Sequence, residues 1–297
     1  MQTQLSSRQM YRRSRIGSME RNLAQLLALM ARTPSQNCVI GQITFAIDYL
    51  VLTMAELIDA FNERLAEVES YLDMLRILEQ MAQNGPPKFE GANQSISVQQ
   101  QKILYSSVYL QLYNLVESTM THCVDAISIA ATIDSGRQAK DLSLQLRREW
   151  VRYITKTHLD LTPDNRLACA LELCQHLVSE LPISSFSIEM GGGGNWDDIA
   201  IEKISNRLGL NLQVSQPVKS NIKRRLKDDL GPLGLVKKFR NQLAHGSISF
   251  SECAGEVNVA WLVDIKDKTA CYLREVVTCF DNYIEMYEYL HPERRPA

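Results

Sequence analysis

Residues 55–81, AELIDAFNERLAEVESYLDMLRILEQM, decide the fold class of this chain. Their apolar side chains recur every three or four positions, at Leu57, Phe61, Leu65, Val68, Leu72, Leu75, Leu78 and Met81. At about 3.6 residues per turn, this spacing puts them on one face of an α-helix, so it predicts a long amphipathic helix with a buried face. Asn84-Gly85-Pro86-Pro87 ends the pattern, and the polar run that follows up to Ser97 is typical of a loop.

The same helical spacing dominates the rest of the chain, and alternating, strand-like runs are nearly absent. We expect further helices over about 98–133, 142–155, 165–181, 196–208 and 257–290, and one that begins near Pro232 and ends before Gly246. Asn195 is the expected N-cap of the helix over 196–208, because a side-chain amide can accept from its first backbone N–H groups. The sequence therefore predicts an all-α bundle.

The composition excludes several classes of function. A length of 297 residues allows one large domain or one domain with an appendage, and 32 basic against 34 acidic residues give no polyanion-binding charge over the whole molecule. Seven cysteines without a CxxC pair indicate scattered, buried thiols in a reducing compartment. There is no zinc-ligand spacing, nucleophile elbow or dinucleotide fingerprint, so we expect neither a metal nor a cofactor.

The N-terminal region is predicted to be a helical extension with a basic tip over residues 1–55, with a second domain over 56–297. Its apolar stretches, Leu23–Ala31 and Val39–Ile58, are interrupted by polar or charged residues, so they indicate neither a signal peptide nor a membrane span. We therefore expect a cytoplasmic protein with no membrane partner. Val39–Ile58 is too apolar to be exposed and should pack against the bundle, the other protomer of a dimer or a partner, the dimer being favoured.

The segment Arg240-Asn241-Gln242-Leu243-Ala244-His245-Gly246 carries the most specific chemistry. Histidine titrates near neutral pH and can give or take a proton, whereas arginine stays charged and presents a planar set of donors to phosphate. Gly246 follows where a left-handed C-cap residue is expected. The segment is a plausible site for breaking RNA without a metal.

Helix geometry separates the two charged side chains of this segment. Asn241 and His245 are four residues apart and share a face, but Arg240 lies about 140° around the helix from His245. A single copy therefore has difficulty placing both on one phosphate. Two copies across a two-fold axis would supply two histidines and two arginines, enough for an acid, a base and a charge clamp.

Spacing alone also allows simpler interpretations. Arg240 and His245 can be a surface arginine and a histidine that binds terminal carbonyls, and a second Arg/His pair, Arg152 and His158, exists without a glycine stop. A basic run supplies candidate phosphate-binding residues, although a solvated helix face explains it equally well. Its candidates are Lys223, Arg224, Arg225, Lys237 and Lys238. Glu117 is either a surface residue or the partner of Arg240.

The segment from Val236 to Gly246 resembles the HEPN nucleases, most closely the MAE_28990/MAE_18760-type group. Residues 113–119, YNLVEST, resemble that group's first bundle helix, and residues 194–197, GNWD, resemble its segment before the catalytic helix. The resemblance implies a helical bundle that dimerises and joins two Arg/His motifs in a shared cleft. It implies Arg240, Asn241 and His245 as the motif residues.

The expected function is therefore that of a metal-independent endoribonuclease, homodimeric, with RNA as substrate. The resemblance implies a toxin of a toxin–antitoxin or antiphage defence system, with an antitoxin or defence protein as partner. The alternative is a non-catalytic HEPN-like module that binds RNA or regulates a neighbouring effector.

Overall fold

A computed structural model describes residues 37–88, 91, 94–184, 186–190 and 195–296, and their side chains from Leu57 onward. The predicted basic tip of the N-terminal extension lies outside these residues, and so do nearly all side chains of the apolar segment that starts at Val39. Thr53–Ala297 forms one compact unit, which is described here by itself.

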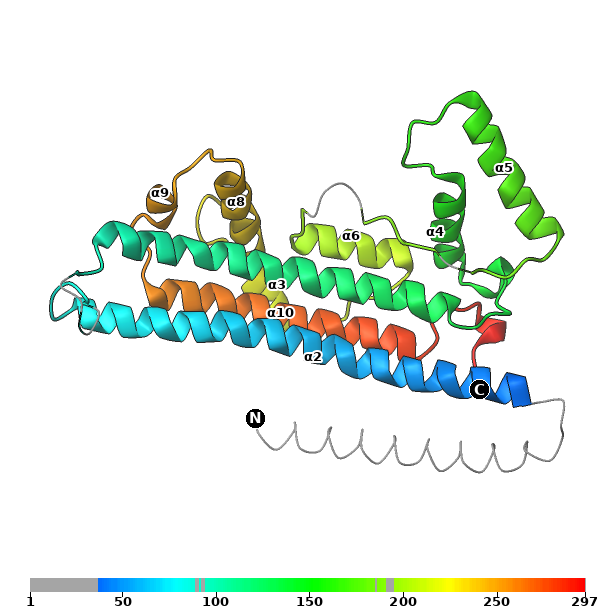
Figure 1. The fold of residues 1–297 in the computed structure, drawn as a ribbon, viewed down its shortest axis with the longest axis horizontal. Coiled ribbons are helices and arrows are strands. Elements are labelled where there is room, and N and C mark those ends of the chain that lie inside the picture. Colours follow the sequence, from blue (N-terminus) through cyan, green and yellow to red (C-terminus); the bar gives the residue numbers. More distant parts are fainter. Residues whose placement is uncertain (1–36, 89–90, 92–93, 185, 191–194, 297) are drawn as a thin grey trace. The chain divides into compact units, whose positions relative to one another are not determined.

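Helices are the regular elements of the described part of the chain, which contains no β-strand (Figure 1). They are α2 (Asn37–Ala82), α3 (Val98–Thr132), α4 (Leu144–Thr155), α5 (Pro163–Val178), α6 (Asp198–Leu208), α7 (Gln216–Lys223), α8 (Pro232–Ala244), α9 (Phe250–Ala254) and α10 (Val259–Glu285). The described residues also form two short 3-10 helices: η1 (Ala139–Asp141) lies between α3 and α4, and η2 (Pro292–Arg294) follows α10. The all-α prediction is confirmed.

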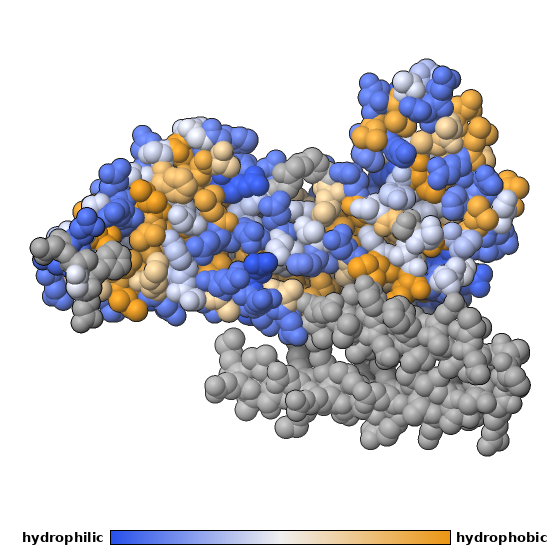
Figure 2. Space-filling view, viewed as in Figure 1, coloured by the Kyte–Doolittle hydropathy of each residue, from blue (hydrophilic) through white to orange (hydrophobic). Residues whose placement is uncertain are grey.

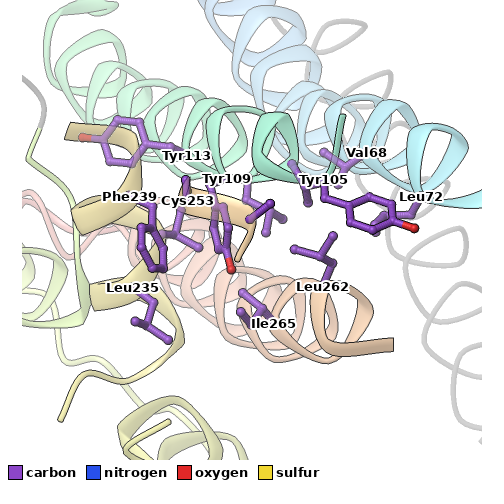
Figure 3. Close-up of a cluster of buried hydrophobic side chains, with 14 of the residues drawn as sticks. Val68, Leu72, Tyr105, Tyr109, Tyr113, Leu235, Phe239, Cys253, Leu262 and Ile265 are labelled. Carbon is purple, nitrogen blue, oxygen red and sulfur yellow. The ribbon is translucent and has the colours of Figure 1, made fainter. Parts of the chain in front are cut away.

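The core lies between the long helices α2, α3 and α10, with α8 and α9 packed against it (Figures 1 and 3). In α2 the predicted apolar face is buried from Leu57 to Leu75, whereas Met81 near the end is 41% exposed. Tyr109 of α3 packs its ring on Phe239 of α8, with ring centroids 4.7 Å apart. This contact is one of several through which the apolar face of α8 packs on the core, because α8 contributes further buried side chains to it.

Side-chain caps account for where the helices begin. Ser97 accepts from the backbone N–H of Gln100, and the Gln100 side chain accepts from the Ser97 N–H, which fixes the start of α3. The prediction for α6 was wrong by two residues, because Asp197 and not Asn195 is its N-cap. A carboxylate next to the positive helix end accepts from the Ala200 N–H, and Asn195 is left free for another contact.

The C-terminal boundary and one short helix also differ from the predictions. α10 ends at Glu285, five residues before the predicted end at Leu290, and Tyr287 has a positive φ of 54°. Tyr289 and Leu290 are buried without being helical, since their chain pairs with the segment before α4. The apolar spacing indicates which positions are buried, and buried positions continue beyond the end of the helix. α9 was not predicted, because a helix of 5 residues is too short to show a period.

The remaining surface has one unusual feature, the apolar side chains of α5. Leu167, Leu171 and Val178 are 60%, 61% and 84% exposed, and Cys169 is the buried residue of this helix. Figure 2 shows apolar surface on this part of the molecule. The cysteines whose side chains are described are free thiols, and the prediction that they are buried holds for only some of them, because Cys174 and Cys271 are exposed. Among the described residues, no helix is both long enough and apolar enough to cross a membrane.

The end of α8 is shaped by Gly246, whose φ is +66°. The Gly246 N–H donates to the Leu243 carbonyl at 3.2 Å, and the Ser247 N–H donates to the Gln242 carbonyl at 2.9 Å. This pair of bonds is a Schellman motif, which uses a left-handed residue just after the helix. The left-handed conformation predicted for Gly246 after the helix is confirmed.

We expect Gly246→Ala to lower the free energy of unfolding by about 1 to 2 kcal/mol, because a Cβ is strained at positive φ. Gly234→Ala, within the same helix, is the matched control: its added Cβ meets Leu230 at an ordinary 3.4 Å, and alanine is the better helix former. Urea unfolding of both variants measures the difference. Equal stability of the two would show that the left-handed position is not strained.

Candidate active site

The exposed His245 side chain stands at the C-terminal end of α8. His245 is the C-cap residue, with φ −90° and ψ 0°, and its backbone N–H donates to the Asn241 carbonyl at 3.0 Å. The Schellman turn then leads the chain away, which leaves the imidazole in solvent. None of the described residues forms a hydrogen bond or ion pair with this imidazole. It is therefore available to a ligand.

Arg240 lies five residues earlier in α8 and is held against α3. Its guanidinium carbon lies 4.4 Å from the centre of the Tyr113 ring, within the range of a cation–π contact. Its Nη2 is 3.8 Å from Oε2 of Glu117, so the predicted pairing of these two residues is present. The Glu117 side chain is 41% exposed, so it pairs with Arg240 while it remains partly open to solvent.

Asn241 connects Arg240 to the segment that precedes α6. Its Oδ1 accepts from Nη1 of Arg240 at 2.9 Å, and its Nδ2 donates to Oδ1 of Asn195 at 3.0 Å. The two bonds use the opposite ends of one amide, so they fix its orientation. Asn195 was predicted only as a helix cap, and its place in the site was missed.

Tyr113 of α3 is buried and also makes a polar contact. Its hydroxyl accepts the backbone N–H of Trp196 at 3.2 Å, and its ring is 2% exposed. Burial raises the pKa of this phenol above its usual value, and the Trp196 N–H opposes the rise. The side chain is therefore neutral at physiological pH.

The predicted RNA-binding lysines and arginines of α7, α8 and the loop between them are mostly paired with carboxylates. Lys237 contacts Asp197, Lys238 lies 2.8 Å from Asp228, Lys223 lies 2.9 Å from Glu202, and Arg225 lies 3.4 Å from Asp229. Arg224 is exposed, and no described residue forms an ion pair with it. These pairs are mostly half-exposed, so they cost little to exchange for phosphate but weaken the local positive field.

The second Arg/His pair is not assembled into a site. Arg152 contacts Glu149, a buried carboxylate of α4 that also lies 3.1 Å from Nε of Arg207. Burial raises the pKa of Glu149, while Arg207 and Arg152 act in the opposite direction. α4 ends at Thr155, so His158 lies beyond the helix. Arg152 has a structural role here, in agreement with the simpler interpretation.

The side chains at the site determine which chemistry it offers. Within the described part of the chain, no group of three or more His, Cys, Asp or Glu side chains is arranged to hold a metal ion. The titratable groups near the end of α8 are the His245 imidazole, the Arg240 guanidinium and the Glu117 carboxylate. This set offers proton transfer and phosphate binding.

Comparison with known proteins identifies the family. A family model described as MAE_28990-like HEPN matches residues 53–289, most of the chain, and includes α3, the segment before α6, and α8. The chain therefore belongs to this HEPN family, as its sequence motifs indicated. No curated protein and no solved structure matches the chain.

Proposed function

We propose that this HEPN protein is a metal-independent endoribonuclease whose chemistry rests on Arg240 and His245. The observation that carries the proposal is the contrast between the two residues at the end of α8. Arg240 is held in place by Tyr113, Asn241 and Glu117, whereas His245 is exposed and free of partners among the described residues. Arg240 is positioned to bind negative charge, and His245 is free to transfer a proton.

The proposed reaction is an attack of the RNA 2′-hydroxyl on the adjacent phosphorus. A base takes the 2′-hydroxyl proton as the new O–P bond forms, the bond from phosphorus to the 5′-oxygen breaks, and an acid protonates that leaving oxygen. Arg240 stabilises the extra negative charge on the phosphoryl oxygens. The products are a 2′,3′-cyclic phosphate and a 5′-hydroxyl, so the reaction consumes no water and needs no metal ion.

Two copies of the chain are proposed to form each site. Arg240 faces α3 and the segment before α6, whereas His245 extends from the C-terminal end of α8. The helical offset of about 140° between the two positions separates them within one chain. A two-fold axis beside α8 would bring the histidine of one protomer to the arginine of its partner.

A role as a toxin in a toxin–antitoxin or antiphage defence system belongs to the same proposal, with an antitoxin or defence protein as the partner. It is supported by the family to which the chain belongs. The toxin role would be supported by a small open reading frame next to this gene, if the product of that reading frame binds this protein and blocks its activity. The cytoplasm is the compartment that suits the free thiols.

A second candidate function, a non-catalytic RNA-binding or regulatory module, is favoured by one observation. Four of the five predicted RNA-binding cations are paired with carboxylates, and Glu117 lies beside Arg240. Such pairing competes with phosphate. This candidate predicts association with RNA, or with a partner protein, and no new RNA ends.

The test is incubation of the purified protein with end-labelled RNA in excess EDTA. We expect shorter RNA products at the same rate as with magnesium, because the proposed acid, base and charge clamp are side chains. Activity that disappears on chelation and returns with magnesium would contradict the mechanism. Intact RNA under both conditions would favour the non-catalytic module.

A further inference from the structure

The segment before α6 is attached to the site by three consecutive residues. Asn195 accepts from Asn241, the Trp196 N–H donates to the Tyr113 hydroxyl, and Asp197 contacts Lys237. These contacts reach α8 and α3 from one short stretch of chain. Trp196 is itself 5% exposed, so the stretch is anchored in the core.

Tyr113 is the centre of this arrangement. Its ring carries the Arg240 guanidinium at 4.4 Å, and its hydroxyl is bound to the backbone of the anchored segment. Figure 3 shows Tyr113 at the edge of the core cluster, with its hydroxyl directed away from the other labelled side chains. The ring is therefore fixed from both sides, by the core and by Trp196.

We propose that Tyr113 is the positioning residue of Arg240, and that Asn195 completes the same support through Asn241. This inference rests on the proposed function, because it assigns Arg240 the role of binding the reacting phosphate. Tyr113 and Asn195 do not touch RNA. They act by restricting where the guanidinium lies before RNA arrives.

The physical basis is the geometry of a stacked guanidinium. An aromatic ring covers one face of the planar group, and its N–H donors point outward in the plane. Arginine has five such donors, and among the described residues the one bond formed uses Nη1, to Asn241. The Arg240 side chain is 27% exposed, so the remaining donors can reach a phosphate.

The Glu117 carboxylate is compatible with this assignment. Its distance of 3.8 Å from Nη2 is longer than a hydrogen bond, and the side chain is 41% exposed. A phosphate can displace such a loose ion pair at little cost. Tyr113, by contrast, stays under the guanidinium throughout.

The test compares Tyr113→Leu with Tyr109→Leu. Tyr109 is four residues earlier on α3 and equally buried, but its ring packs on Phe239 and its hydroxyl accepts from Nε1 of Trp261. Both variants remove a core tyrosine ring, and only one removes the support of Arg240. Tyr113→Phe keeps the ring and loses the bond to Trp196.

We expect Tyr113→Leu to cleave RNA roughly 3- to 30-fold more slowly per folded molecule than Tyr109→Leu, the range that a cation–π contact spans. The loss should appear in kcat more than in KM, since the guanidinium still binds phosphate but is poorly placed. Tyr113→Phe should recover most of the rate. Equal rates for Tyr113→Leu and Tyr109→Leu would overturn the inference.

An NMR measurement without RNA separates this inference from the proposed function. Because the guanidinium carbon lies 4.4 Å from the centre of the Tyr113 ring, we expect the Arg240 Nε–H resonance to carry a ring-current shift, which Tyr113→Leu should change and Tyr109→Leu should not. If the wild-type protein cleaves no RNA, the nuclease proposal fails while this resonance still decides the contact. An unchanged Arg240 resonance in Tyr113→Leu contradicts the positioning role.

Discussion

His245→Ala is expected to reduce RNA cleavage by at least about 100-fold, and to the detection limit if the histidine serves as both acid and base. The side chain is exposed at the end of α8, and no described residue forms a hydrogen bond or ion pair with it, so its removal should leave the fold intact. Initial rates on labelled RNA in EDTA, with circular dichroism to compare folding, measure the effect. The change is large because the proposed mechanism assigns proton transfer to this imidazole.

The second Arg/His pair supplies the control for this variant. His158→Ala removes an exposed histidine that is outside a helix and far along the chain from α8, and its rate should equal that of the wild type. Arg152→Ala should likewise keep its rate per folded molecule, although it loses the contact with buried Glu149. Full activity in His245→Ala, or loss of activity in His158→Ala, would contradict the assignment of the site.

The second large effect is expected from mixing two inactive proteins. Arg240→Ala and His245→Ala should each be nearly inactive, and their mixture should recover up to about a quarter of wild-type activity after subunit exchange. Half of the dimers are then mixed, and each mixed dimer retains one site with both residues if a site borrows from two chains. Activity is measured after mild unfolding and refolding together.

The control mixture is Arg240→Ala with the double variant Arg240→Ala/His245→Ala. Neither chain of this mixture has Arg240, so no activity should be recovered. Native mass spectrometry establishes that mixed dimers have formed. Mixed dimers without recovered activity would show that each site belongs to one chain. A wild-type protein that is monomeric at assay concentration and still active would exclude the composite site altogether.

Local sequence patterns predicted the elements that depend on local rules. The apolar face of α2 was predicted because its buried residues repeat with the helical period, and the left-handed Gly246 because the residue just after a helix is commonly glycine. The same local rules failed at Leu290, where burial continues after the helix has ended. Periodicity reports which residues are buried, and helix ends depend on caps and on tertiary pairing.

Local rules could not predict the contacts that hold Arg240 in place, because the residues that form them are far apart in the sequence. The Asn195–Asn241 bond spans 46 residues, and the Trp196–Tyr113 bond spans 83. No period connects these positions, so Asn195 was assigned the nearest local role, a helix cap. One signal was present: Tyr113 and Glu117 are four residues apart on α3, and the partner predicted for Glu117 was already Arg240.

We propose that the protein cleaves RNA by attack of the RNA's own 2′-hydroxyl on the adjacent phosphorus, with protein side chains as the only catalytic groups. The most direct measurement is cleavage in EDTA of a DNA strand that contains a single ribonucleotide, with identification of both new ends by mass spectrometry. The account predicts one cut after the ribonucleotide, a 2′,3′-cyclic phosphate and a 5′-hydroxyl, and no cut in the all-DNA strand. A 5′-phosphate end, or cleavage that needs added metal, would contradict it.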